Sequence, residues 1–183
     1  MTKEVLFTMP RTKSRLDISM YPEGLSAYGK GLGILARHLM WHHGRGVVTL
    51  GNSAEAMWQD LRAVALKNLA ILPKAEHITG QLAYDMYTGG LADMQAAYKR
   101  SGLNLKGKII VEDYAHRLGK IANLHSLFEH LGFPMRFVLL YAGTTAQWNI
   151  ADYGLNVRVI INEHTPQLEA LLATRKTSRN FRR

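Results

Sequence analysis

The feature that most constrains the fold is an amphipathic segment between two short apolar runs in the second half of the chain. The apolar runs, at 108–111 and 135–141, are rich in Ile, Val, Leu and Phe, which predicts buried strands. Residues 114–131 carry apolar side chains at helical spacing, and Gly132 follows as a helix-ending glycine. Two strands joined through a helix are expected to pair in parallel with a right-handed connection. The sequence therefore predicts an α/β protein.

Further segments follow the same alternation of strands and helices. Residues 46–50 predict another buried strand, and residues 54–72 predict a helix with Ser53 as its N-cap and Pro73 at its end. The other predicted elements are a helix at 34–40 after the glycine-rich segment 29–33, a helix at 92–100, a strand at 155–161 and a helix at 168–174. This order predicts a mixed, partly parallel sheet flanked by helices.

The composition limits the class of protein. With 183 residues, of which 47% are hydrophobic and 20% charged, the chain has enough apolar side chains for one buried core. We expect a single α/β domain over 1–174, with a basic N-terminal segment over 1–15 and a basic tail over 175–183. No apolar stretch approaches the roughly 20 residues that span a bilayer, so no membrane partner is expected. No secretory signal is visible.

The chain contains no cysteine. Disulfides, thiolate metal ligands and a cysteine nucleophile are therefore excluded, which fits a cytoplasmic protein. Any catalytic or metal site has to be built from Asp, Glu, His and other oxygen- or nitrogen-bearing side chains.

The net charge of +9, from 23 Lys and Arg against 14 Asp and Glu, is the strongest functional signal. A basic surface attracts polyanions. Many of the cations lie near the two ends of the chain: Arg11, Lys13, Arg15, Arg175, Lys176, Arg179, Arg182 and Arg183. Arginine dominates the C-terminal group, and its guanidinium binds phosphate through two parallel hydrogen bonds. We therefore predict a nucleic-acid-binding protein that holds phosphates through its basic ends, with nucleic acid or another polyanion as partner.

A carboxylate pair at a predicted strand end supplies a second hypothesis. Glu112 and Asp113 follow the apolar run 108–111, and ligands of open α/β sheets bind at the carboxyl ends of strands. Two carboxylates there would hold a divalent cation such as Mg²⁺, and His116 would serve as acid or base. This hypothesis is a metal-dependent nuclease or phosphoryl-transfer enzyme. The alternative is structural, since acids at the start of a helix stabilise its dipole.

The segment 108–131 resembles the second metal-binding carboxylate of the RuvC-like resolvases in the ribonuclease H superfamily, in which an acid ends a strand and a helix follows. The resemblance implies a nuclease. Asp17, between Leu16 and Ile18, is the nearest counterpart of the superfamily's opening aspartate, and residues 162–164 do not match its C-terminal acidic pair.

Two weaker patterns have structural alternatives. The glycines at 29, 31 and 33 would let backbone amides approach a phosphate, but we prefer the simpler explanation of a flexible entry to a helix. His38 and His42 share one helical face at a spacing that would chelate zinc, although surface or hydrogen-bonded histidines are more common.

A third hypothesis is an assembly role. Basic arms at both ends commonly thread between subunits, which is typical of a structural subunit of a viral particle or another large complex, and of a homo-oligomer. Concentration-dependent assembly without affinity for nucleic acid would favour this hypothesis over the other two.

Overall fold

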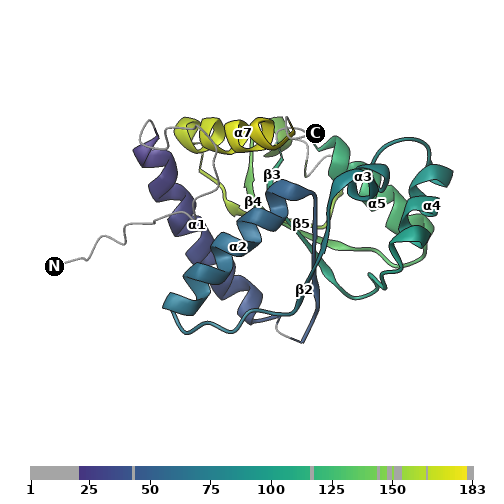
Figure 1. Ribbon diagram of the computed structural model, residues 1–183, viewed down its shortest axis with the longest axis horizontal. Helices are drawn as coiled ribbons and strands as arrows, with labels where there is room; N and C mark the ends of the chain where they lie inside the picture. The colour runs from purple at the N-terminus through teal and green to yellow at the C-terminus, as the bar shows by residue number, and fades with distance from the viewer. Residues whose placement is uncertain are drawn as a thin grey trace.

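The computed structural model describes residues 21–42, 44–115, 118–143, 145–147, 150, 154–163 and 165–180. Within them, one sheet of five strands lies between two layers of helices (Figure 1). This arrangement confirms the α/β class and the sheet flanked by helices. None of the described helices is long and apolar enough to cross a membrane.

The strands pair in the order β2-β1-β3-β4-β5. Their bounds are Val47–Leu50 for β1, Ala75–Ile78 for β2, Ile109–Ala115 for β3, Arg136–Ala142 for β4 and Val157–Ile161 for β5. All four pairings are parallel, where the sequence predicted a partly parallel sheet. The reason is that each connection between successive described strands is long enough for a crossover, and none is a hairpin turn.

The helices divide between the two faces of the sheet (Figure 1). One face is covered by α1 (Pro22–Met40), α2 (Asn52–Lys67) and α7 (Pro166–Asn180), and the other by α3 (Gly80–Asp85), α4 (Leu91–Ser101) and α5 (Gly119–His130). The division follows from handedness, because β1 leads to β2 in one direction along the sheet and β3 leads to β4 in the other. Right-handed connections then place α2 and α5 on opposite faces.

Two hydrophobic clusters, one on each face, form the core. The cluster under α1, α2 and α7 includes the buried side chains of Tyr28, Leu32, Leu35, Leu39, Met57, Leu61 and Tyr141. The cluster under α3, α4 and α5 includes Leu50, Met86, Leu105, Phe128 and Phe137. The central strand β3 supplies both, with Ile109 and Val111 on the first side and Ile110 on the second, because successive strand residues face opposite ways.

Helix α1 is longer than the sequence predicted. It begins at Pro22, where the missing N–H of proline costs no hydrogen bond, and it runs through the glycine-rich segment. A Cβ on Gly31 would lie 2.4 Å from Cδ1 of Ile161, and one on Gly24 would lie 2.6 Å from the carbonyl oxygen of Gln167. These two glycines allow α1 to pack closely against β5 and α7. The phosphate-loop interpretation is wrong, because the glycines lie inside a helix.

Strand β3 is longer than predicted, and the helix after it starts later. The helix predicted over 114–131 begins at Gly119, and Tyr114 belongs to β3, where its ring stacks on that of Tyr141 with centroids 5.8 Å apart. Glu112 and Asp113 therefore lie inside a strand, and their placement at the start of the following helix is wrong. The strand continues through both residues to Ala115 and is buried along its whole length.

Helices α2 and α7 end at other residues than predicted. The backbone of α7 remains helical through Asn180, past the predicted end at Thr174, so the basic segment 175–183 begins as a continuation of this helix. Helix α2 stops at Lys67 instead of Leu72. The residues after Lys67 form a turn that the apolar spacing does not distinguish from another helical turn.

The turn after α2 places a leucine in an unfavourable backbone conformation. The N–H of Ala70 donates to the carbonyl oxygen of Ala65 at 2.9 Å, and that of Leu69 to the carbonyl oxygen of Leu66 at 3.4 Å. These are the two hydrogen bonds of a Schellman motif. Leu69 occupies its left-handed position with φ of 51°, and no other described non-glycine residue has positive φ. Glycine is the residue that this position favours.

Replacing Leu69 with glycine is expected to stabilise the protein by about 1 kcal/mol, because glycine adopts the left-handed conformation without the Cβ clash. The Tm should rise by about 2–4 °C in a chain of this size. Leu69→Ala is the matched control, since it removes the exposed side chain but keeps the Cβ. Its free energy of unfolding in urea should stay within about 0.5 kcal/mol of the wild type. An equal gain in both variants would contradict the backbone explanation.

Candidate functional site

From β1 the chain continues to β2 on one side of the sheet, and from β3 it continues to β4 and β5 on the other side, so the direction of the strand order reverses between β1 and β3. Doubly wound sheets bind their ligands at such a reversal, next to the carboxyl ends of the strands. Strand β1 ends there at Leu50, and β3 passes through Glu112 and Asp113. The predicted carboxylate pair therefore lies at the reversal point of the sheet. The sequence found the two residues through their position after an apolar run, although the strand is longer than predicted.

Glu112 is held by a lysine from the next helix. Its side chain is 4% exposed, and Nζ of Lys120 lies 2.7 Å from Oε1 and 2.8 Å from Oε2. Lys120 also donates to the carbonyl oxygen of Leu50 at 2.6 Å and lies 4.8 Å from the ring centroid of Tyr87. The ammonium group thus compensates the buried carboxylate and links the ends of β1 and β3. Sequence reasoning missed Lys120, because its pairing depends on where α5 starts.

Asp113 interacts with the beginning of α2. It is 4% exposed, and Oγ of Ser53 donates to its Oδ1 at 3.2 Å. Ser53 lies in the first turn of α2, and the N-cap is Gly51, whose φ of 101° is available to glycine. The sequence predicted Ser53 as the N-cap, and its hydroxyl instead reaches across to β3. The N-terminus of α2 carries partial positive charge, which stabilises the nearby carboxylate.

The two carboxylates point to opposite faces of the sheet. Glu112 contacts α5, and Asp113 contacts α2, as expected for neighbouring residues in a strand. They do not form a shared chelating pair, and the described residues hold no cluster of three or more His, Asp or Glu side chains suited to a metal ion. His116 lies outside the described residues. A catalytic role for these three residues stays a prediction.

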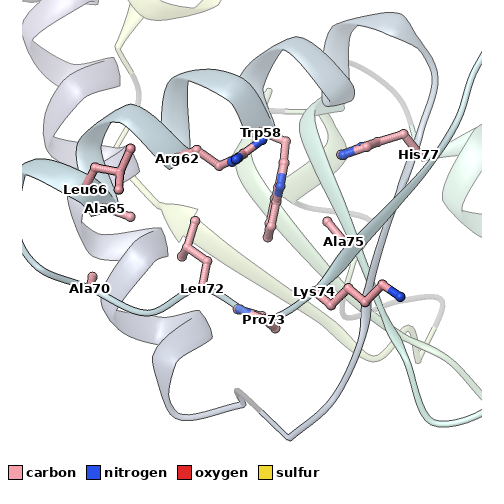
Figure 2. A pocket seen from close by; sticks show the side chains of 10 residues that line it. All are labelled: Trp58, Arg62, Ala65, Leu66, Ala70, Leu72, Pro73, Lys74, Ala75 and His77. Carbon is pink, nitrogen blue, oxygen red and sulfur yellow. The ribbon is translucent and has the colours of Figure 1, made fainter.

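A groove lies between α2 and the edge strand β2 (Figure 2). Its volume is about 380 Å³, and the residues that line it are Trp58, Arg62, Ala65, Leu66, Ala70, Leu72, Pro73, Lys74, Ala75 and His77. The buried Trp58 extends from α2 toward Ala75 of β2 and forms part of its wall (Figure 2). Sequence reasoning missed this groove, because its walls come from two elements whose contact only the fold decides.

The lining of the groove is apolar apart from three basic side chains. Arg62, Lys74 and His77 are exposed, and no carboxylate lines the groove. Nδ1 of His77 lies 2.7 Å from Oγ1 of Thr49, a buried residue of β1, and this hydrogen bond fixes the imidazole. The groove therefore has the lining that an amphipathic anion requires.

Several of the acidic residues that the structure describes are buried or partly buried. The hydroxyl of Tyr28 donates to Oδ2 of Asp60 at 2.8 Å, between α1 and α2, with both residues buried. The hydroxyl of Tyr114 donates to Oε1 of Glu169 at 2.8 Å. Burial raises the pKa of Tyr114, and the hydrogen bond to Glu169 raises it further, so the phenol remains a donor. Each of these two carboxylates thus accepts a hydrogen bond from a tyrosine of another element.

The exposed charges are predominantly positive. The exposed cations among the described residues are Lys30, Arg37, Arg45, Arg62, Lys67, Lys74, Lys99, Arg100, Lys106, Arg136 and Arg158. The exposed carboxylates among them are Glu23, Asp93, Glu129 and Glu163. The described surface is therefore more basic than the ratio of 23 Lys and Arg to 14 Asp and Glu in the sequence suggests.

The basic chain ends fall mostly outside these residues. Arg11, Lys13, Arg15, Arg182 and Arg183 lie beyond them, and the backbone positions of Arg175, Lys176 and Arg179 belong to α7. The structure thus attaches the C-terminal basic segment to a helix whose Leu168, Leu171 and Leu172 are buried in the core.

His38 lies in the last turn of α1, whereas His42, which the sequence placed on the same helical face, lies two residues beyond the end of the helix. The rings of His38 and His42 meet edge to face with centroids 5.1 Å apart. Burial lowers the pKa of His38, and the positive charges of His42 and Arg158 lower it further.

Comparison of the chain with protein-family models, with curated proteins and with solved structures found no match. The function therefore has to be inferred from the residues and geometry described above.

Lys120→Met is expected to destabilise the protein by about 3 kcal/mol, because it leaves the carboxylate of Glu112 buried without its cation. Adding Glu112→Gln should recover more than half of the loss in urea denaturation. Lys108→Met is the control, since Lys108 forms a more exposed pair with Glu76 at 2.6 Å, and it should cost about 1 kcal/mol or less. Equal losses in the two single variants would show that Glu112 does not depend on Lys120.

The pKa of His38 in the folded protein lies below its ordinary value of 6.5. The folded state therefore binds this proton more weakly than the unfolded state, and stability is lost as the pH falls below 6.5. His38→Gln should lose less free energy of unfolding than the wild type between about pH 7.5 and 5. His130→Gln, at an exposed position, is the control and should follow the wild-type curve. Parallel curves for wild type and His38→Gln would contradict the assignment.

Proposed function

We propose that the protein binds nucleic acid, or another polyanion with regularly spaced phosphates, through its basic surface and basic chain ends. The observation that supports the proposal best is the contrast between inward-facing carboxylates and outward-facing cations. Asp60, Glu112 and Asp113 are buried and hydrogen-bonded, whereas most of the described lysines and arginines are exposed. A field of this sign concentrates polyanions at the surface and accelerates their association.

The C-terminal basic segment is the strongest candidate for direct phosphate contact. It contains Arg175, Lys176, Arg179, Arg182 and Arg183 and no acid. The buried leucines of α7, Leu168, Leu171 and Leu172, precede this segment in the helix. Arginine-rich segments contact phosphate through paired hydrogen bonds and position a protein on nucleic acid without selecting a sequence.

The other two hypotheses gain no specific support. Glu112 and Asp113 contact different helices, which is not the arrangement of a two-carboxylate magnesium site. The metal-dependent nuclease and the assembly subunit both stay predictions. The binding experiment includes the observation that would support the nuclease.

Fluorescence anisotropy with labelled single- and double-stranded DNA and RNA over a salt series tests the proposal. We expect binding that weakens steeply with salt, because each engaged Lys or Arg releases a counterion. Replacing the five cations of 175–183 with glutamine should flatten the logarithmic salt slope by about 0.9 for each lost contact to duplex DNA. Loss of the intact probe only in the presence of Mg²⁺ would support the nuclease hypothesis.

Glutamine at Lys99 and Lys106 is the control for the five-residue variant. These two exposed lysines lie on and after α4, and their replacement should change the slope by less than the loss of the basic tail. No binding to any probe at low salt would overturn the proposed function. Strong binding that the tail substitutions leave unchanged would overturn only the role of the tail.

A further inference from the structure

We propose that the groove between α2 and β2, together with the turn after α2, docks an acidic amphipathic segment of a partner protein. This surface, here called the α2–β2 surface, comprises the groove lining and residues 66–72. The inference goes beyond nucleic-acid binding, because the surface combines cations with apolar side chains that phosphates do not require.

Large aliphatic side chains are exposed in the last turn of α2 and on the turn that follows it. Leu66 is 76% exposed, Leu69 92% and Ile71 76%. Leu66 also lines the groove. Ala70 and Leu72, which alternate with the exposed Leu69 and Ile71 in the sequence, line it as well. Single exposed apolar residues are common, but three within six residues beside a groove indicate an interaction surface.

The backbone at Leu69 supports the same conclusion. Leu69 holds the left-handed position of a Schellman motif, where glycine would be more stable. Its side chain is almost wholly exposed, so it contributes little to packing of the core. Glycine at this position would make the protein more stable than the strained, exposed leucine does. The leucine therefore points to a role in contact with another molecule.

The charges of the surface specify a negatively charged occupant. Arg62, Lys74 and His77 line the groove, exposed Lys67 lies at the end of α2, and the groove lining contains no carboxylate. Among the described residues, neither Arg62 nor Lys74 forms a salt bridge. An acidic partner would therefore find Arg62 and Lys74 available to pair with it.

The same charges disfavour two other occupants. A second copy of the chain would bring an equal set of cations against this one in a two-fold interface, and like charges at an interface are repulsive. A nucleic acid would pair with the cations but would leave Leu66, Leu69 and Ile71 against a polar backbone. An acidic segment with aliphatic side chains on one face satisfies both the charge and the apolar rim.

The test is a titration of ¹⁵N-labelled full-length protein with a synthetic 18-residue peptide that has leucines at helical spacing and glutamates elsewhere. We expect saturable shifts of amide resonances confined to residues 58–77. Two control peptides should each bind at least about tenfold more weakly. One has the same composition but its leucines at scrambled positions, and the other has lysine in place of glutamate. Equal binding of all three peptides, or shifts elsewhere in the protein, would overturn the proposal.

Leu69→Gly separates docking from folding. It should weaken binding of the acidic peptide about tenfold, since a buried leucine is lost, while the Tm stays at or above that of the wild type. Arg62→Gln with Lys74→Gln should weaken binding about fivefold or more. The control is Lys99→Gln with Lys106→Gln, which should leave the peptide affinity unchanged. Unchanged affinity in Leu69→Gly would overturn the proposal.

Two further measurements test whether a second copy of the chain or a nucleic acid occupies the surface instead. Sedimentation velocity over a concentration series would reveal a dimer, and a dimer that Leu69→Gly abolishes would assign the α2–β2 surface to a second copy and overturn the proposal. Oligonucleotide-induced shifts over 58–77 would assign it to nucleic acid with the same consequence. If nucleic-acid binding fails altogether but the peptide binds at 58–77, the docking proposal stands and the proposed function fails.

Discussion

The structure depends on the parallel pairing of all its described strands. A parallel sheet requires a crossover between neighbouring strands, and the crossovers cover both of its faces. The central strand β3 is consequently buried along its entire length. Glu112 and Asp113 lie in that strand, so each needs a partner inside the protein, and each takes one from the helix on its own side: Lys120 from α5 and Ser53 from α2. The geometry of the candidate site is thus a consequence of the sheet topology.

The burial of acids also shapes the outside of the molecule. Asp60 is buried against Tyr28, and Glu169 accepts a hydrogen bond from Tyr114. These interactions join helices to one another and to the sheet, and they withdraw negative charge from the surface. What remains exposed is mainly lysine and arginine. The net charge does not change with this burial, but the charged groups left for direct contact with the polyanion that we propose are mainly cations.

The two proposals concern surfaces of different chemistry. The basic segment 175–183 carries cations and, apart from the aromatic Phe181, no large apolar residue, which suits a phosphate backbone. The α2–β2 surface carries cations beside Leu66, Leu69 and Ile71, which suits an acidic protein segment. A protein with both could hold nucleic acid and an acidic protein at the same time, and the variants described above affect one surface without the other.

The sequence by itself determined the α/β class, the strands of the second half and the carboxylate pair that follows the apolar run 108–111, because apolar runs and helical spacing are local signals. It also determined the net charge. Only the tertiary structure decided that Tyr114 and Ala115 extend β3 and that the glycines of α1 pack against β5 and α7, since an apolar run fits a buried strand and a helix equally. The partners of Glu112 and Asp113, and the groove between α2 and β2, likewise depend on contacts between residues far apart in the chain. Such contacts leave no periodic pattern, because the order of the strands in the sheet, and not their order in the sequence, brings those residues together.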